Sequence, residues 1–114
     1  MTTEAELDQL IDELVGEYPP ATTDPVTFLG AQFDQGLAWV HFPVGQGGLG
    51  ATPAEQLYVL RRLARLGAPT AMGRNVIGYG MCAPTIVAHG TDEQQQRFLR
   101  PLFTGEEIWC QLFS

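Results

Sequence analysis

Apolar residues near the start of the chain recur at the spacing of an amphipathic helix. Five of them follow Thr3 on one helical face: Leu7, Leu10, Ile11, Leu14 and Val15. Thr3 and Glu6 have the spacing of a capping box, and acidic residues in the first turn suit the positive end of the helix dipole. The pattern predicts a first helix from about residue 4, ended by Gly16 and the two prolines that follow.

Three more segments combine a start signal with a helical period. Asp24 before Pro25 suits an N-cap and first turn, while Thr52 and Thr91 each begin a capping-box pattern. A glycine is expected to end each helix: Gly36, Gly67 and Gly105. The side chains predicted to face the core are Phe28, Leu29, Phe33, Leu57, Leu60, Leu63, Ala64, Leu66, Phe98, Leu99, Leu102 and Phe103.

Residues 70–88 are almost uncharged and apolar around most of a helical circumference, which is typical of a centrally buried helix. Pro84 is expected to kink this helix. Three glycines weaken it by about 1 kcal/mol each relative to alanine: Gly73, Gly78 and Gly80. Glycines on a buried helix indicate that something approaches closely, either a neighbouring helix or a ligand.

Two short apolar runs have the character of extended chain. Residues 37–43 end at a proline, so they predict an extended segment or at most an edge strand. Residues 108–114 predict a buried strand whose unpaired edge would be an aggregation hazard. We therefore expect a mainly α domain, and we expect the chain to be the front part of something longer.

Composition and charge narrow the class of protein. The 114 residues suffice for one domain, with 13 acidic against 6 basic side chains and a formal net charge of -7. That balance argues against binding to nucleic acid or to an anionic lipid surface. No apolar run reaches about 18 residues, so we expect no membrane span. Cys82 and Cys110 lie in apolar settings and are interpreted as reduced core residues of a cytoplasmic protein.

Acidic residues are concentrated at the front of the chain. Residues 1–34 hold eight acids and no base. Much of this charge falls on the polar side of the first predicted helix, so we interpret it as a solvated face. The arginines of the third predicted helix receive the same interpretation: Arg61, Arg62 and Arg65.

The run from Gly45 to Gly50 matches G-x-G-x-x-G, but the context of a dinucleotide site is missing. The third glycine precedes the helix cap at Thr52, so it lies outside the helix that it should pack against. No acid occurs between Glu55 and Asp92, where a ribose-binding carboxylate is expected. We interpret these glycines as a compact turn.

Candidate nucleophiles and acid–base pairs are weak. Cys82 and His89 lie seven positions apart on one helix, but nothing nearby would lower the pKa of the thiol. His89 is better placed to interact with the helix C-terminus. Two further pairs are candidates by spacing alone: His41 with Asp34, and Glu106 with Glu107. The chain is therefore predicted to hold no metal site and no complete catalytic group.

Three blocks in the last two thirds of the chain resemble the acyl-CoA dehydrogenase family. The first runs from Trp39 to Pro43 and leads into the glycine turn. The second, from His89 to Leu99, is similar to the family's "GT.eQk..yL" signature, and the third, from Gly105 to Ser114, is similar to the approach to the family's "EPgaGSD" motif. The resemblance implies a helical N-terminal domain over 1–107 and the start of a β-sheet middle domain at 108–114.

The resemblance implies a flavoenzyme of three domains that oxidises an acyl-CoA thioester across its α and β carbons. In that family a glutamate takes the α proton and FAD accepts a hydride at N5. The glutamate belongs to the C-terminal domain, so no catalytic residue is expected in this chain. Cofactor-binding residues carried over from the resemblance are Gln111, Phe113 and Ser114.

The family lines its acyl channel with one face of the helix before the second block. By that resemblance the substrate-binding residues here are Gly73, Arg74, Ile77, Gly78 and Met81. Glycines would leave room for an acyl group, and Met81 would form an adaptable wall. Arg74 departs from an all-apolar channel, so it favours a polar or bulky acyl group or closes the pocket by pairing with an acid.

The resemblance also implies partners: acyl-CoA as substrate, an electron-transfer flavoprotein as electron acceptor, and a homo- or heterotetramer. Two alternatives stay open. One is an acyl-CoA oxidase or flavin monooxygenase of the same fold. The other is a free-standing helical interaction module that uses its final strand and its acidic first helix.

Overall fold

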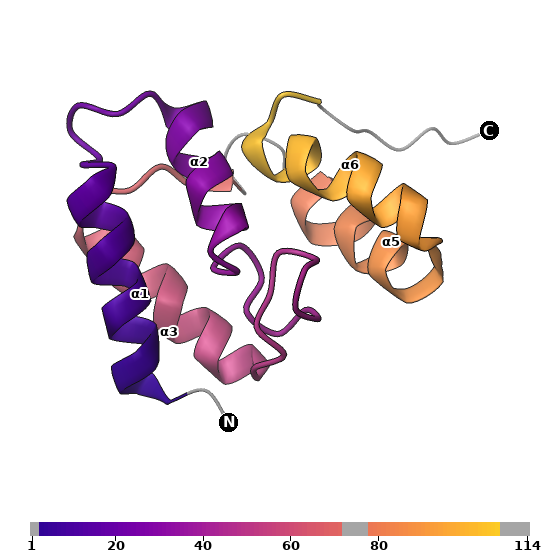
Figure 1. The fold of residues 1–114 in the computed structure, drawn as a ribbon, viewed down its shortest axis with the longest axis horizontal. Helices are drawn as coiled ribbons and strands as arrows, with labels where there is room; N and C mark the ends of the chain where they lie inside the picture. The colour runs from indigo at the N-terminus through magenta and orange to yellow at the C-terminus, as the bar shows by residue number, and fades with distance from the viewer. Residues whose placement is uncertain (1–2, 72–77, 108–114) are drawn as a thin grey trace.

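The structure, a computed structural model, describes residues 3–71 and 78–107 (Figure 1). Its elements are α1 (Glu4–Glu17), α2 (Pro25–Asp34), α3 (Pro53–Arg65), the π-helical turn η1 (Gly78–Cys82), α5 (Ala83–His89) and α6 (Asp92–Thr104). Extended pairing within the described ranges is limited to one bridge, between Val44 and Gly48. The expected mainly α fold is confirmed. The strand predicted for residues 108–114 lies outside the described residues.

Side chains begin the helices where the sequence predicts. The Thr3 hydroxyl accepts a hydrogen bond from the N–H of Glu6, and the Asp24 carboxylate accepts one from the N–H of Thr27. Thr52 and Thr91 form complete capping boxes, in which the side chain three residues on also bonds back to the cap. Glycines with positive φ follow α2, α3 and α6: Gly36, Gly67 and Gly105.

Two hydrophobic clusters form the core, and α2 contributes to both. One packs α1 against α2 and α3 and includes Leu7, Ile11, Leu14, Phe28, Val59 and Leu63. The other joins α2, α5 and α6 and includes Leu29, Trp39, Tyr79, Leu99, Leu102 and Phe103. Consecutive residues on a helix point about 100° apart. The neighbours Phe28 and Leu29 therefore fill different clusters, and α2 lies between the two halves of the structure (Figure 1).

The buried face of α3 differs from the predicted one. Leu57 is 47% exposed and Leu66 is 40% exposed, whereas Gln56 and Val59 are buried beside Leu63. Polar contacts with α1 lie along the polar side of the helix in this orientation. Arg62 lies 3.3 Å from Asp8 and 3.2 Å from Asp12, and the Tyr58 hydroxyl donates to Asp8. Arg62 is thus partly exposed, as the sequence predicts, and it also forms ion pairs with α1 that the sequence did not indicate.

The prediction of a centrally buried helix over 70–88 is also wrong in the part that the structure describes. Between residues 79 and 89 only Tyr79 and Ala83 are buried, and Met81 is 49% exposed. Pro84 lies in the first turn of α5, where a helix does not need the missing N–H. A π-helical turn followed by a short α-helix thus replaces the kinked helix expected here.

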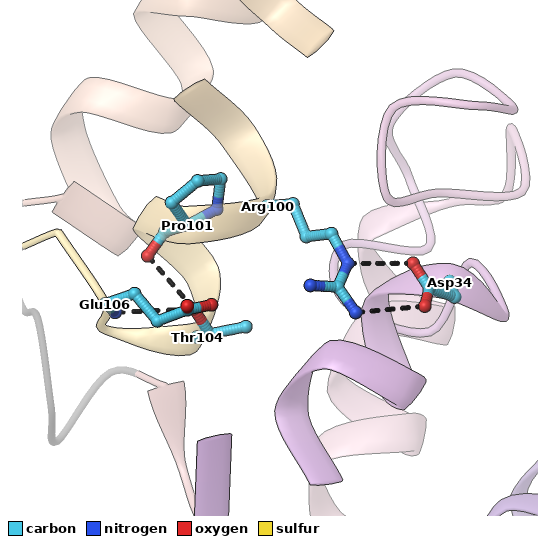
Figure 2. A network of polar contacts seen from close by, with 5 residues as sticks. All are labelled: Asp34, Arg100, Pro101, Thr104 and Glu106. Atoms are coloured by element: carbon cyan, nitrogen blue, oxygen red, sulfur yellow. Dashed lines mark hydrogen bonds and ion pairs between the residues drawn. The ribbon is translucent and has the colours of Figure 1, made fainter. Parts of the chain in front are cut away.

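An ion pair joins α2 to α6 (Figure 2). Arg100 donates two hydrogen bonds to the Asp34 carboxylate, one from Nε at 3.0 Å and one from Nη2 at 3.1 Å. The guanidinium lies against the backbone of Gly30, where an added Cβ would sit 2.6 Å from Nη2. Figure 2 also shows Thr104, whose hydroxyl contacts the Pro101 carbonyl and the Glu106 side chain at the end of α6.

The contact between Gly30 and Arg100 predicts a coupled effect on stability. In an Arg100→Ala background, Gly30→Ala should stabilise the protein by about 1 kcal/mol, because alanine favours a helix interior over glycine. With Arg100 present the gain should shrink or reverse, since the new methyl group displaces the guanidinium from Asp34. Urea unfolding of the four proteins measures the coupling free energy. Equal effects of Gly30→Ala in both backgrounds would contradict this packing.

Candidate functional site

The residues that the resemblance assigned to a site fall into two groups. Gly78 and Met81 belong to η1 and are described. Six others lie outside the described residues: Gly73, Arg74, Ile77, Gln111, Phe113 and Ser114. The described part of the candidate site is therefore η1 and the side chains packed against it.

The outer side of η1 is open. The Met81 side chain is half exposed, and a Cβ added at Gly80 would meet no atom within 4 Å. Short π-helical turns are rare and often occur at functional sites. This turn therefore presents a flexible apolar side chain next to bare backbone, which suits contact with an apolar group of variable shape.

The inner side of η1 is anchored by Tyr79 in an aromatic cluster of five rings: Phe33, Trp39, Phe42, Tyr79 and Phe103. Trp39 stacks against Tyr79 with the ring centroids 5.2 Å apart and against Phe42 at 5.0 Å. Phe103 from α6 meets Trp39 edge-on at 5.0 Å. Aromatic pairs in such geometries contribute about 0.5–1.5 kcal/mol beyond their burial. The cluster thus fixes η1 to α6 and to the segment after α2.

Gln56 connects this cluster to α3. Its buried amide accepts a hydrogen bond from the N–H of Val40 at 2.8 Å and donates one to the Ala38 carbonyl at 3.0 Å. The same nitrogen donates to the Tyr79 hydroxyl oxygen at 3.0 Å. Burial raises the pKa of Tyr79, and the hydrogen bond from Gln56 acts weakly in the opposite direction. The hydroxyl is therefore a neutral hydrogen-bonding group rather than a charged one at physiological pH.

An apolar cavity of about 180 Å³ lies beside Tyr79. Its walls come from the end of α3, from residues 68–71 and from the rings of Tyr79 and Phe103. Gln32, only 2% exposed, also lines it, and its Oε1 makes no hydrogen bond. An apolar cavity of roughly 150 Å³ is enough to hold benzene. The space therefore suits a small hydrocarbon group.

The glycine run at 45–50 is a compact turn, as the sequence predicts. Its backbone bonds back onto the preceding segment, with Leu49 N–H donating to Val40 at 3.0 Å and Gly50 N–H donating to Phe42 at 2.8 Å. Trp39 N–H donates to the Gly47 carbonyl at 2.9 Å. These amides are used within the loop, so they do not form a cradle for phosphate. The turn instead holds the backbone of Trp39 through the Gly47 carbonyl.

The carboxylates among the acid–base candidates, Asp34, Glu106 and Glu107, are engaged in other contacts. Asp34 pairs with Arg100, and Arg97 holds the Glu107 carboxylate at 2.8 Å and lowers its pKa. His41 is half-buried, and burial lowers its pKa. Across residues 3–71 and 78–107, no cluster of His, Cys, Asp or Glu could hold a metal ion.

Among the helices of residues 3–71 and 78–107, none is long and apolar enough to cross a membrane.

Sequence reasoning did not single out Tyr79 or Gln56. A signal for Gln56 was present, because it stands at i, i+3 and i+7 with Val59 and Leu63 on the buried face of α3. A glutamine in that position must satisfy its amide inside the core. Nothing local in the sequence indicates that its partners are Ala38, Val40 and Tyr79.

The chain belongs to the acyl-CoA dehydrogenase family. The model of the acyl-CoA dehydrogenase N-terminal domain matches residues 3–106, which includes all the helices described above. The expected membership is thereby confirmed.

Two relatives carry the same family name. The chain is 47% identical over 81 residues to acyl-CoA dehydrogenase FadE34 of Mycobacterium tuberculosis, a match covering 71% of this chain and 11% of that protein. It is 37% identical over 79 residues to acyl-CoA dehydrogenase IpdE1 of Mycolicibacterium smegmatis, a match covering 69% of this chain and 20% of that protein. The chain thus spans a small part of the length of these relatives. None of the solved structures compared with it matches significantly.

Two glycines of the turn should respond differently to the same substitution. A Cβ at Gly48 would lie 2.1 Å from the Phe42 carbonyl oxygen and 2.4 Å from that of Trp39, and neither backbone atom can move aside cheaply. Gly48→Ala should therefore cost about 3 kcal/mol or more of unfolding free energy. Gly45 has φ 88° and open space around it, so Gly45→Ala should cost only about 1 kcal/mol of backbone strain. Urea unfolding compares the two, and equal losses would contradict the structural role of Gly48.

Proposed function

We propose that the chain forms the helical N-terminal part of an FAD-dependent acyl-CoA dehydrogenase. The observation that carries this is the family match across residues 3–106. The complete protein would remove hydrogen from the α and β carbons of an acyl-CoA thioester. When bound, FAD supplies the acceptor for the hydride from the β carbon. A glutamate outside this chain would take the α proton.

In that reaction this chain contributes binding rather than bond breaking. The proposed substrate-binding face comprises Gly73, Arg74, Ile77, Gly78 and Met81. The open outer side of η1 supports this proposal for Met81, because an exposed methionine beside bare backbone can adapt to an acyl group. The role of the other four, including Gly78 on the same turn, rests on the family resemblance.

The remaining assignments are proposals of the same kind. FAD would contact Gln111, Phe113 and Ser114, at the start of a β-sheet middle domain that begins at residue 108 and follows a helical domain over 1–107. The complete protein would act in the cytoplasm, pass electrons to an electron-transfer flavoprotein and assemble as a homo- or heterotetramer.

The protein expressed from its natural reading frame should test this function directly. It should copurify with FAD, and anaerobic addition of an acyl-CoA should bleach the flavin absorbance. Ferrocenium should then sustain turnover while oxygen does so slowly. Rapid oxygen consumption with formation of hydrogen peroxide would instead identify an oxidase. A protein without flavin would overturn the proposed function in favour of an interaction module.

The proposal that Gly78 lines the acyl-binding site can be tested by placing a larger side chain at this position of η1. Gly78→Leu should lower kcat/KM for longer acyl groups relative to shorter ones by about tenfold, the effect of excluding a methylene or more from a fitted pocket. Gly16→Leu is the matched control, because Gly16 lies on α1, away from the proposed face, and an added Cβ there would also meet no atom within 4 Å. Arg74→Ala should change the preference for polar or bulky acyl groups. An unchanged acyl-CoA profile in both Gly78→Leu and Arg74→Ala would contradict the proposed substrate-binding face.

A further inference from the structure

The hydrogen bond between Gln56 and Tyr79 joins α3 to the inner side of η1. We propose that Tyr79, held by Gln56, is a positioning residue that sets where Gly78 and Met81 lie relative to the acyl group and so tunes acyl selectivity. This inference rests on the proposed function, because it takes the open side of η1 to face the substrate.

Tyr79 is the main anchor of the turn that carries these two residues. Its ring is buried, whereas Gly80 and Met81 beside it are exposed, and Cys82 at the far end is half-buried. Gly78 and Gly80 flank the tyrosine and have no side chain with which to fix their own position. Glycine backbone is also conformationally permissive. A displacement of the Tyr79 ring therefore carries the neighbouring backbone with it.

Packing restrains the Tyr79 ring on one side and leaves space on another. The ring stacks against Trp39 and lies 6.2 Å from the Phe103 ring, centroid to centroid, but it also lines the cavity of about 180 Å³. Among the described residues, the ring is therefore less closely packed on the cavity side. The hydrogen bond from Gln56 at 3.0 Å supplies a directional restraint that stacking does not.

Gln56 is itself held in place, which makes it a fixed reference point. Its oxygen accepts from Val40 and its nitrogen also donates to Ala38, so the amide cannot flip without losing both bonds. The segment it binds carries Trp39, the stacking partner of Tyr79. Both restraints on the tyrosine ring therefore originate from one rigid unit, formed by α3 and the segment from Ala38 to Val40.

Tyr79→Phe in the full-length protein tests the proposal, because it keeps the ring and removes the hydrogen bond. The ratio of kcat/KM for a longer to a shorter acyl-CoA should change about fivefold, the scale of one ordinary hydrogen bond, with most of the change in KM. The matched control is Tyr58→Phe, which removes a tyrosine hydroxyl that donates to Asp8 at the contact of α1 with α3. The control should leave the ratio unchanged.

The ratio separates positioning from stability. A variant that merely folds less well loses active protein equally for every substrate, so its ratio stays the same. An unchanged ratio in Tyr79→Phe, with a loss of stability like that of Tyr58→Phe, would therefore overturn the proposal. Gln56→Leu gives an independent variant, and it should change the ratio in the same direction. The double variant should show no greater change than Gln56→Leu alone, because Gln56→Leu already removes the hydrogen bond to Tyr79 along with those to Ala38 and Val40.

Gly78→Leu distinguishes this inference from the proposed function on which it rests. If Gly78→Leu shifts the acyl profile and Tyr79→Phe does not, the positioning role is overturned while the channel assignment stands. If neither variant shifts the profile, both fall. A shift in both, absent from Gly16→Leu and Tyr58→Phe, supports both.

Discussion

The amide of Gln56 solves a problem created by the segment between α2 and α3. Residues 37–43 are largely buried, yet they form neither helix nor strand, so their backbone N–H and C=O groups need partners from elsewhere. Gln56 binds Val40 and Ala38, while Gln32 donates to the Leu37 carbonyl at 3.0 Å. The glycine turn contributes further backbone bonds. With these groups satisfied, Trp39 can occupy the centre of the aromatic cluster that holds η1.

The helix boundaries could be read from the sequence because their signals are local. Thr52 and Thr91 cap their helices through residues only three positions away. The buried face of α3 could not be read in the same way. The contacts on either side of this helix are distant in sequence: Gln56 binds Ala38 and Val40, and Arg62 binds Asp8 and Asp12, about fifty positions earlier. The hydrophobic period predicted that Leu57 rather than Gln56 would be buried, because such a pattern carries no information on which distant carbonyl groups need a hydrogen-bond donor.

The candidate site shows the same division. The family resemblance pointed to Gly78 and Met81, and both lie on the one π-helical turn described between Gly78 and Cys82. The residues that fix this turn were missed, because Tyr79 and Gln56 lie 23 positions apart and meet only in the folded chain. The acidic residues of the first helix were interpreted as a solvated face; Asp8 and Asp12 are partly exposed and also pair with Arg62 on α3. Asp34 pairs with Arg100 on α6, a partner that the sequence did not indicate.

The placement of α2 between two hydrophobic clusters has a consequence for how the protein folds. A ten-residue helix is too short to persist alone in water, so α2 forms only when both neighbours pack on it. Phe28 belongs to one cluster and Leu29 to the other, which means that neither half can lose its packing without disturbing the helix that serves its counterpart. The domain should therefore form and melt as one cooperative unit, with α2 as the element that transmits the transition.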